Sequence, residues 1–150
     1  MTAFVTGGAG FLLAVLWFDL MFDVQAARRR DPEVPEAALR SIAAYYRRVT
    51  TAARPMNRLI AAVMAGTIAA IGVQFARGDA PRWAAAVSFV LATGAISLAA
   101  LHTVPCAVRL GRQADATVEQ SRLARSILRD HVICIVAVAA VLFVQLTFAR

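Results

Sequence analysis

Four long apolar stretches that contain no charged residue run along the chain, at positions 3–18, 59–76, 83–101 and 132–149. Each is close to the roughly 17 to 25 apolar residues that a helix needs to cross a bilayer. Extended to the flanking polar residues, the stretches predict spans at about 3–27, 57–77, 82–110 and 117–149. The pattern therefore predicts one domain over residues 1–150, an all-α integral membrane protein built as an up-down four-helix transmembrane bundle with cytoplasmic helical extensions.

The segment between the first two spans has a different pattern, in which apolar and polar positions alternate with helical spacing. Its apolar positions recur every three or four residues, at Leu39, Ile42, Tyr46, Val49 and Ala53. Asp31-Pro32 is typical of a helix start. We therefore predict an amphipathic cytoplasmic helix at about 32–53, which lies on the membrane surface or caps the bundle.

Breaker and capping residues divide the remaining chain. The tight turn Gly78-Asp79-Ala80-Pro81 predicts that spans two and three form an antiparallel hairpin. Pro105 removes a backbone hydrogen bond and is expected to kink the end of span three, and Gly111 is a plausible stop. Thr117-Val118-Glu119-Gln120 resembles a capping box that opens the last helix. In span one, the glycines near Gly8 predict close helix packing.

Composition supports a membrane location, and charge predicts its orientation. The chain is 60% apolar with a mean hydropathy of +0.65, more apolar material than a soluble domain of 150 residues can cover. All 16 basic residues are arginine, and most lie in the connections between spans one and two and between spans three and four. The positive-inside rule then places both connections in the cytoplasm, next to anionic lipid, and both termini outside the cell (inner) membrane. This segregation argues against nucleic-acid binding.

The predicted topology gathers most polar residues of the spans in one layer near the cytoplasmic side. This layer contains Asp19, Asp23, Asn57, Arg58, His102, Cys106, Asp130, His131 and Cys134. Ionisable groups at membrane depth are costly, so such a layer suggests a functional site. We treat Asp19, Asp23, His102 and His131 as candidate catalytic residues. Asn57, Arg58 and Asp130 are candidates for substrate binding.

Asp19 and Asp23 are four residues apart and so share one helix face, where two like charges need a cation or a shared proton. One interpretation is a structural salt-bridge layer with Arg58 or Arg129. The alternatives are a bound metal, a proton relay or a polar substrate pocket.

The two histidines and two cysteines form a second candidate group. His102 and Cys106 are one turn apart on span three, and His131 and Cys134 are one turn apart on span four. Because these spans are antiparallel, the four side chains are predicted at similar depth, where they could hold zinc or copper. A haem held by His102 and His131 is the other cofactor hypothesis. Against both, cysteines in spans often act as small apolar fillers.

Three short motifs resemble those of the small four-span membrane proteins that include the fungal anthrone oxygenases and many uncharacterised bacterial members. They are Arg54-Pro55-Met56-Asn57, Thr103-Val104-Pro105 and Asp130-His131-Val132. The resemblance implies an oxygenase-like membrane pocket for a flat apolar substrate, with Asn57, His102 and His131 polarising it. His131 would suit the role of general base, because imidazole titrates near neutral pH.

Two classes of function follow from the sequence. The first is a membrane oxygenase or oxidoreductase-like enzyme, with an enclosed pocket that contacts Asp19, His102 and His131. The second is a non-catalytic accessory or assembly subunit of a larger membrane complex, or of a homo-oligomer, in which the same groups pair with one another. A transporter is less favoured, because the outer half of the spans contains no ionisable group.

Overall fold

The computed structural model describes residues 1–27 and 33–149, and every regular element in these ranges is helical. The elements are α1 (Thr2–Asp23), a 3-10 turn (Val24–Ala26), α2 (Glu36–Thr51), α3 (Arg54–Arg77), α4 (Arg82–Leu98), a π-helical turn (Ala99–Thr103), α5 (Val104–Arg112) and α6 (Thr117–Phe148). Four helical stretches are long and apolar enough to cross a membrane: Thr2–Ala26, Arg54–Arg77, Arg82–Arg112 and Thr117–Phe148. They coincide with the four predicted spans. The expected helix start at Asp31-Pro32 lies outside the described residues.

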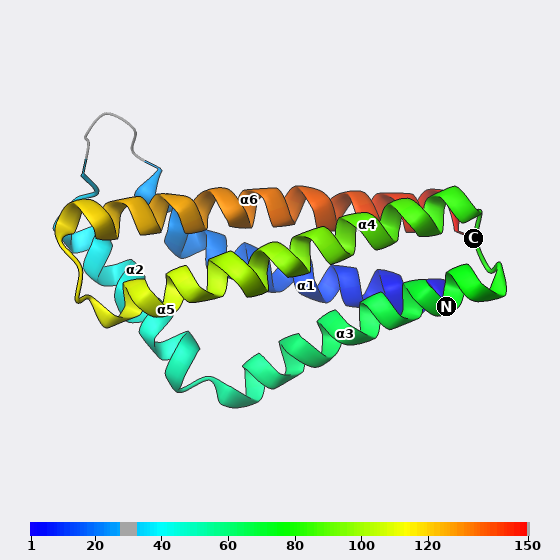
Figure 1. The fold of residues 1–150 in the computed structure, drawn as a ribbon, viewed down its shortest axis with the longest axis horizontal. Helices are drawn as coiled ribbons and strands as arrows, with labels where there is room; N and C mark the ends of the chain where they lie inside the picture. Colours follow the sequence, from blue (N-terminus) through cyan, green and yellow to red (C-terminus); the bar gives the residue numbers. More distant parts are fainter. Residues whose placement is uncertain (28–32, 150) are drawn as a thin grey trace.

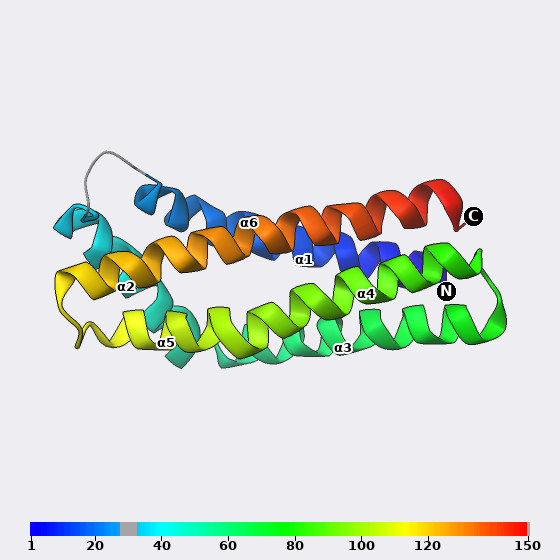
Figure 2. The same cartoon turned by 45° about the horizontal axis from the view of Figure 1, so that its top comes forward.

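The long helices pack side by side, with α1 and α4 both against α6 and with α3 against α1 and α4 (Figure 1). The two chain ends meet at one end of the molecule, where the Thr2 hydroxyl donates a 2.6 Å hydrogen bond to the Ala149 carbonyl. At the opposite end, α2 and α5 lie beside the first turns of α6 (Figure 2). The inclined α3 diverges from α4 and α6 toward this second end.

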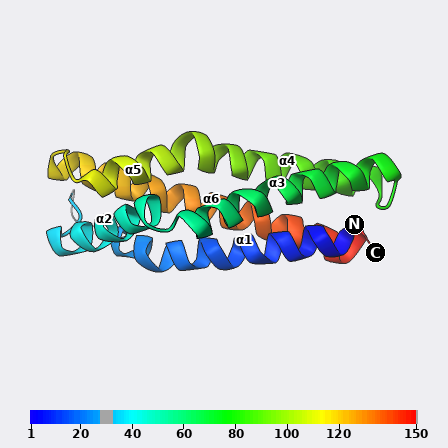
Figure 3. The same cartoon turned by 90° about the horizontal axis from the view of Figure 1, so that it is seen from below.

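Helix α2 covers the end of the bundle. Its side chains Leu39, Ile42 and Tyr46 are buried, as the amphipathic pattern predicts, and Ile42 forms a core with Leu110 of α5 and Ile127 of α6. The view from below shows α2 at this end of the molecule, running in much the same direction as α1 (Figure 3). Helix α2 thus packs against α5 and α6, while its position relative to a membrane surface stays a prediction.

Gly111 does not end α5, although the sequence suggested it as a stop. The helix continues to Arg112 and is capped by Gln113, which has a left-handed backbone with φ of 53°. A Cβ atom added to Gly111 would lie 2.9 Å from the backbone nitrogen of Arg47 on α2. The glycine therefore permits the close approach of α2 and α5.

Span three is irregular just before Pro105, where the proline was expected to disturb it. The disturbance is the π-helical turn Ala99–Thr103, after which α5 begins with Pro105 in its first turn. Such turns insert an extra residue and change which side chains share a face. Here the turn carries His102 and Thr103.

The capping box predicted at Thr117 is wrong. Helix α6 is preceded by Ala116 and has no side-chain cap, and the Gln120 amide, which such a box would need, donates a 2.6 Å hydrogen bond to the Asp115 carbonyl instead. The close helix packing predicted at the glycines of span one is confirmed at Gly8, because an added Cβ atom would clash with the Thr67 hydroxyl of α3.

Candidate functional site

The two aspartates of α1 face α2 and α6 at the end of the bundle that α2 covers. Asp23 is fully buried and His131 of α6 is 6% exposed. The Nδ1 atom of His131 lies 2.5 Å from Oδ2 of Asp23. The other carboxylate oxygen of Asp23 accepts a 2.6 Å hydrogen bond from the hydroxyl of Tyr46 on α2. Both oxygens of this buried carboxylate therefore have a partner, as a buried charge requires.

Asp19 lies one helical turn before Asp23 and is held in a similar way. Its Oδ1 accepts a 2.5 Å hydrogen bond from the Tyr45 hydroxyl. Its Oδ2 lies 3.9 Å from Nε2 of His131, which is too long for a hydrogen bond. These two atoms therefore remain able to bind a ligand.

The salt-bridge layer suggested for Asp19 and Asp23 is wrong in its partners. Arg129 contacts Asp130, at 3.3 Å, and Arg58 is exposed outside the cavity described below. The two carboxylates are instead stabilised by His131 and by two phenols. Sequence reasoning missed the phenols because Tyr46 fits the apolar stripe of α2, and nothing in that stripe shows where its hydroxyl points.

The environment of Tyr45 and Tyr46 keeps both phenols protonated. Burial raises the pKa of Tyr45 far above its usual range, and its hydrogen bond to Asp19 raises that pKa further. Burial also raises the pKa of Tyr46, with the nearby charge of Asp23 as the second cause. Both residues therefore act as hydrogen-bond donors to carboxylates at neutral pH.

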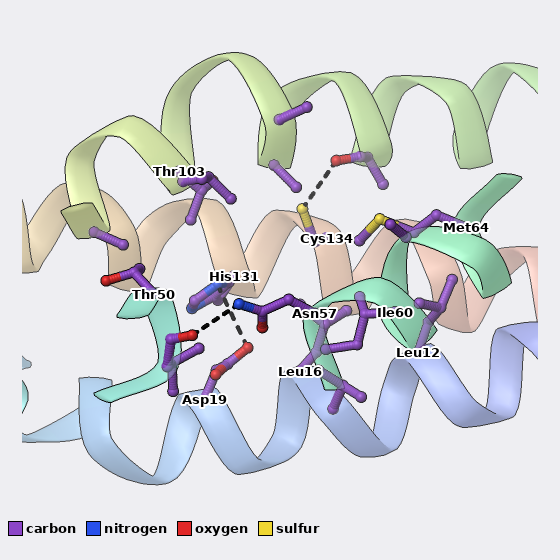
Figure 4. A pocket seen from close by; sticks show the side chains of 18 of the residues that line it. Leu12, Leu16, Asp19, Thr50, Asn57, Ile60, Met64, Thr103, His131 and Cys134 are labelled. Atoms are coloured by element: carbon purple, nitrogen blue, oxygen red, sulfur yellow. Dashed lines mark hydrogen bonds and ion pairs between the residues drawn. The ribbon is translucent and has the colours of Figure 1, made fainter. Parts of the chain in front are cut away.

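A cavity of about 370 Å³ lies beside this group, between all four long helices and α2. Its walls are mostly apolar, with residues such as Leu16, Ile60 and Met64 (Figure 4). Asp19 and His131 are among the polar groups that line it. The cavity is therefore an apolar chamber with a small polar region, as is typical of small-molecule sites.

Asn57 and three other polar side chains complete the cavity lining. The Asn57 amide donates a 2.8 Å hydrogen bond to the Val49 carbonyl, which joins the start of α3 to the end of α2. Thr50, Thr103 and Cys134 also line the cavity (Figure 4). The Cys134 thiol donates to the Ala95 carbonyl at 3.5 Å.

His102 does not line this cavity and belongs to a second, separate pair. Its Nδ1 lies 2.5 Å from Oδ2 of Asp130, which is fully buried and also accepts a 3.2 Å hydrogen bond from Thr103. His102 lies on the outer side of its helix together with Cys106, whose Sγ is 3.8 Å from the His102 Nε2 atom. The two histidines therefore hydrogen-bond different aspartates, His102 with Asp130 and His131 with Asp23.

The four proposed metal ligands His102, Cys106, His131 and Cys134 are not assembled into one site. Within residues 1–27 and 33–149, no group of three or more His, Cys, Asp or Glu side chains is arranged to hold a metal ion. The helical spacing explains the separation, since His102 and Cys106 face away from the cavity that His131 and Cys134 line. The same geometry contradicts the haem hypothesis, because His131 lines the cavity and His102 lines a separate hollow.

Comparisons with protein-family models, with curated proteins and with solved structures give no match. The resemblance to the anthrone oxygenases therefore stays a prediction.

The arrangement around His131 is suited to general acid–base chemistry. The Asp23 carboxylate accepts from Tyr46 and lies at hydrogen-bond distance from Nδ1 of His131, and a neutral ring that donates from Nδ1 has no proton on Nε2. The Nε2 atom then holds the lone pair and lies at the cavity. A carboxylate that fixes the tautomer of a histidine in this way is the arrangement that enzymes use to orient a catalytic base.

Proposed function

We propose that this chain is an integral protein of the cell (inner) membrane with an up-down arrangement of four spans. The charge pattern supports this orientation. The arginine-rich ends of α5 and α6 and the whole of α2 lie at one end of the molecule, and the two chain ends lie at the other (Figure 1). The positive-inside rule assigns the first end to the cytoplasm and the termini to the opposite side.

We further propose that the protein is a membrane enzyme that acts on an apolar small molecule in the cavity, with His131 as the general base. The observation that carries this proposal is the position of His131, whose Nδ1 is held by Asp23 while its Nε2 faces the cavity beside Asp19. A base in such a position needs no further movement to take a proton from a ligand.

The cavity indicates the chemical class of the substrate. A volume of about 370 Å³ falls within the range of small-molecule sites, and the lining favours an apolar body. The polar region requires one end of that body to carry an acidic C–H or O–H group, which Nε2 of His131 deprotonates. The Asn57 amide, which also lines the cavity, is a candidate donor to the oxygen on which negative charge develops.

An oxygenase-like reaction, which the resemblance implies, fits this first step. The proton passes from the substrate carbon to Nε2 of His131, and the electron pair left on carbon forms a C–O bond with O2. Protonation of the distal oxygen by the imidazolium then gives a hydroperoxide and restores the base. The carboxylate of Asp23 stabilises the imidazolium during this cycle.

Oxygen uptake with anthrone as the probe, in proteoliposomes, tests the proposal. We expect His131→Gln to lower kcat by about 10²- to 10⁴-fold, the usual contribution of a general base. His102→Gln is the matched control, because His102 has an equivalent Asp partner but faces away from the cavity. Equal uptake by the wild type and His131→Gln would contradict the proposed role.

A second candidate function is a non-catalytic subunit of a larger membrane complex. It is favoured by the complete pairing of Asp23 and Asp130, both fully buried, and by exposed aromatic side chains such as Trp17, Phe18 and Phe143. Gentle solubilisation followed by size measurement separates the two candidates, since a subunit migrates with a partner of defined stoichiometry and the enzyme keeps its activity alone.

A further inference from the structure

A second hollow, of about 660 Å³, lies between α5 and the first half of α6, on the outer side of the molecule. We call it the arginine groove, and its polar lining includes Arg109, Arg122, Arg125, Arg129, His102 and Ser126. None of the described residues that line it is acidic. The cavity of the proposed enzyme lies on the opposite face of α5, where Val104, Ala107 and Val108 line it.

Carboxylates pair with Arg109, Arg122 and Arg129 and leave much of each of these three cations accessible. Arg109 binds Asp115 at 2.8 Å and Glu119 at 3.2 Å, and its side chain stays 50% exposed. Arg122 binds Glu119 at 2.8 Å and stays 75% exposed. Arg129 contacts Asp130 at 3.3 Å and stays 67% exposed. A guanidinium has about five N–H donors, so the contacts of Arg109, Arg122 and Arg129 with carboxylates leave donors of each group unused.

The exposed guanidinium groups of Arg109, Arg122 and Arg129 lie around one concave surface, where their unused N–H donors can bind an anion. Their planar N–H forks match the oxygens of a phosphate, which can accept several hydrogen bonds at once. Ser126, between Arg122 and Arg129 in the sequence, adds a hydroxyl to the lining. The chemistry of the groove therefore favours a phosphate group.

The surface next to the groove indicates where this phosphate comes from. Ile133 and Val136 follow Arg129 at spacings of four and seven residues, so they continue the same face of α6. Both are exposed, at 48% and 64% of the residue surface. A molecule with its phosphate in the groove can therefore place a hydrocarbon chain along this face.

We infer that the arginine groove binds the phosphate ester of an anionic lipid headgroup, with an acyl chain along the adjoining face of α6. This site is separate from the proposed catalytic cavity and does not depend on its chemistry. Because the groove lies where the charged part of α6 meets its apolar part, a bound lipid would fix the height of the helix in the bilayer.

Native mass spectrometry of the detergent-solubilised chain tests this site. Phosphatidylglycerol and phosphatidylcholine of equal chain length are titrated onto the wild type and onto Arg122→Gln/Arg129→Gln. The control is Arg47→Gln/Arg48→Gln, which removes the same charge from exposed positions on α2. We expect tighter binding of phosphatidylglycerol than of phosphatidylcholine, and at least a tenfold weakening in the groove variant alone, as expected for the loss of charged hydrogen bonds.

Inorganic phosphate distinguishes the headgroup from a soluble source. Retention of phosphatidylglycerol against millimolar inorganic phosphate is expected for a lipid site, whereas its displacement by phosphate alone would overturn the lipid as the source. Equal binding of the two lipids, or equal weakening in both double variants, would overturn the inference. The single variant Arg122→Gln, whose partner Glu119 keeps its contact with Arg109, serves if the double variant does not fold.

Discussion

His131 and Asp23 are 108 residues apart in sequence, yet Nδ1 of one lies 2.5 Å from Oδ2 of the other in the buried interior near the end of the bundle that α2 covers. This contact joins α1 to α6, and the Tyr46 hydroxyl extends it to α2. The Asp23 carboxylate thus joins α1, α2 and α6. The pair has a structural role whether or not the histidine is also catalytic.

Asp23→Ala is expected to destabilise the fold by about 3–5 kcal/mol, because it leaves the buried His131 and Tyr46 without their common partner. Unfolding in mixed micelles with increasing SDS, followed by circular dichroism, measures this loss. Glu36→Ala is the control, since it removes an exposed ion pair with Arg40 and is expected to change stability by less than about 1 kcal/mol. An equal loss of unfolding free energy in the two variants would show that the contacts of Asp23 are not buried.

Tyrosine ionisation offers a direct test of the contacts between α1 and α2. The chain has two tyrosines, Tyr45 and Tyr46, so tyrosinate absorbance near 295 nm reports on both and on nothing else. Because the folded-state pKa of each is raised, we expect little tyrosinate at pH 11 in the folded protein, while the unfolded chain titrates near pH 10.

The same shift has a consequence for stability. A raised folded-state pKa means that the contribution of these phenols is fully present below about pH 10 and is lost as the pH rises further. Asp19→Asn should lower the pKa of Tyr45, although burial, the first cause, remains. Titration of the native protein at pH 10, with its helix content unchanged, would contradict the burial of both phenols.

Gly111→Ala is expected to destabilise the protein by about 1–3 kcal/mol, because its new Cβ would lie 2.9 Å from the Arg47 backbone and would force α2 away from α5. Gly72→Ala is the matched control, since nothing lies within 4 Å of its added Cβ and alanine is the better helix former. SDS unfolding of the two variants side by side measures the difference. A Gly111→Ala variant as stable as Gly72→Ala would mean that α2 and α5 are not in close contact.

The helices could be predicted from the sequence because each rests on a local signal. A charge-free apolar run needs no partner to be recognised, and the start and end of α6 lie within one residue of the prediction. The end of α5 was less predictable, since Gly111 looks like a stop when its neighbours are unknown. Its role depends on Arg47, which is 64 residues away.

The candidate site could be predicted in composition but not in its pairs. Asp23 and His131 were expected near one another because both lie at the same end of their spans. Which histidine meets which aspartate depends on the rotation of each helix about its axis, and the π-helical turn before Pro105 changes that rotation for His102. The two tyrosines could not be found at all by searching for charges.

The divergence of α3 decides how a ligand reaches the cavity. Three residues that line the cavity are exposed, and all three are apolar: Ala61, Ala100 and Val104. Ala61 lies on α3, and the other two lie across the gap, in the π-helical turn and in α5. In a bilayer this mouth would open sideways into the hydrocarbon. The protein then responds to the amount of ligand dissolved per lipid molecule. If more membrane is added at a constant total amount of ligand, the ligand is diluted in the lipid, so the apparent affinity, expressed per volume of water, should weaken.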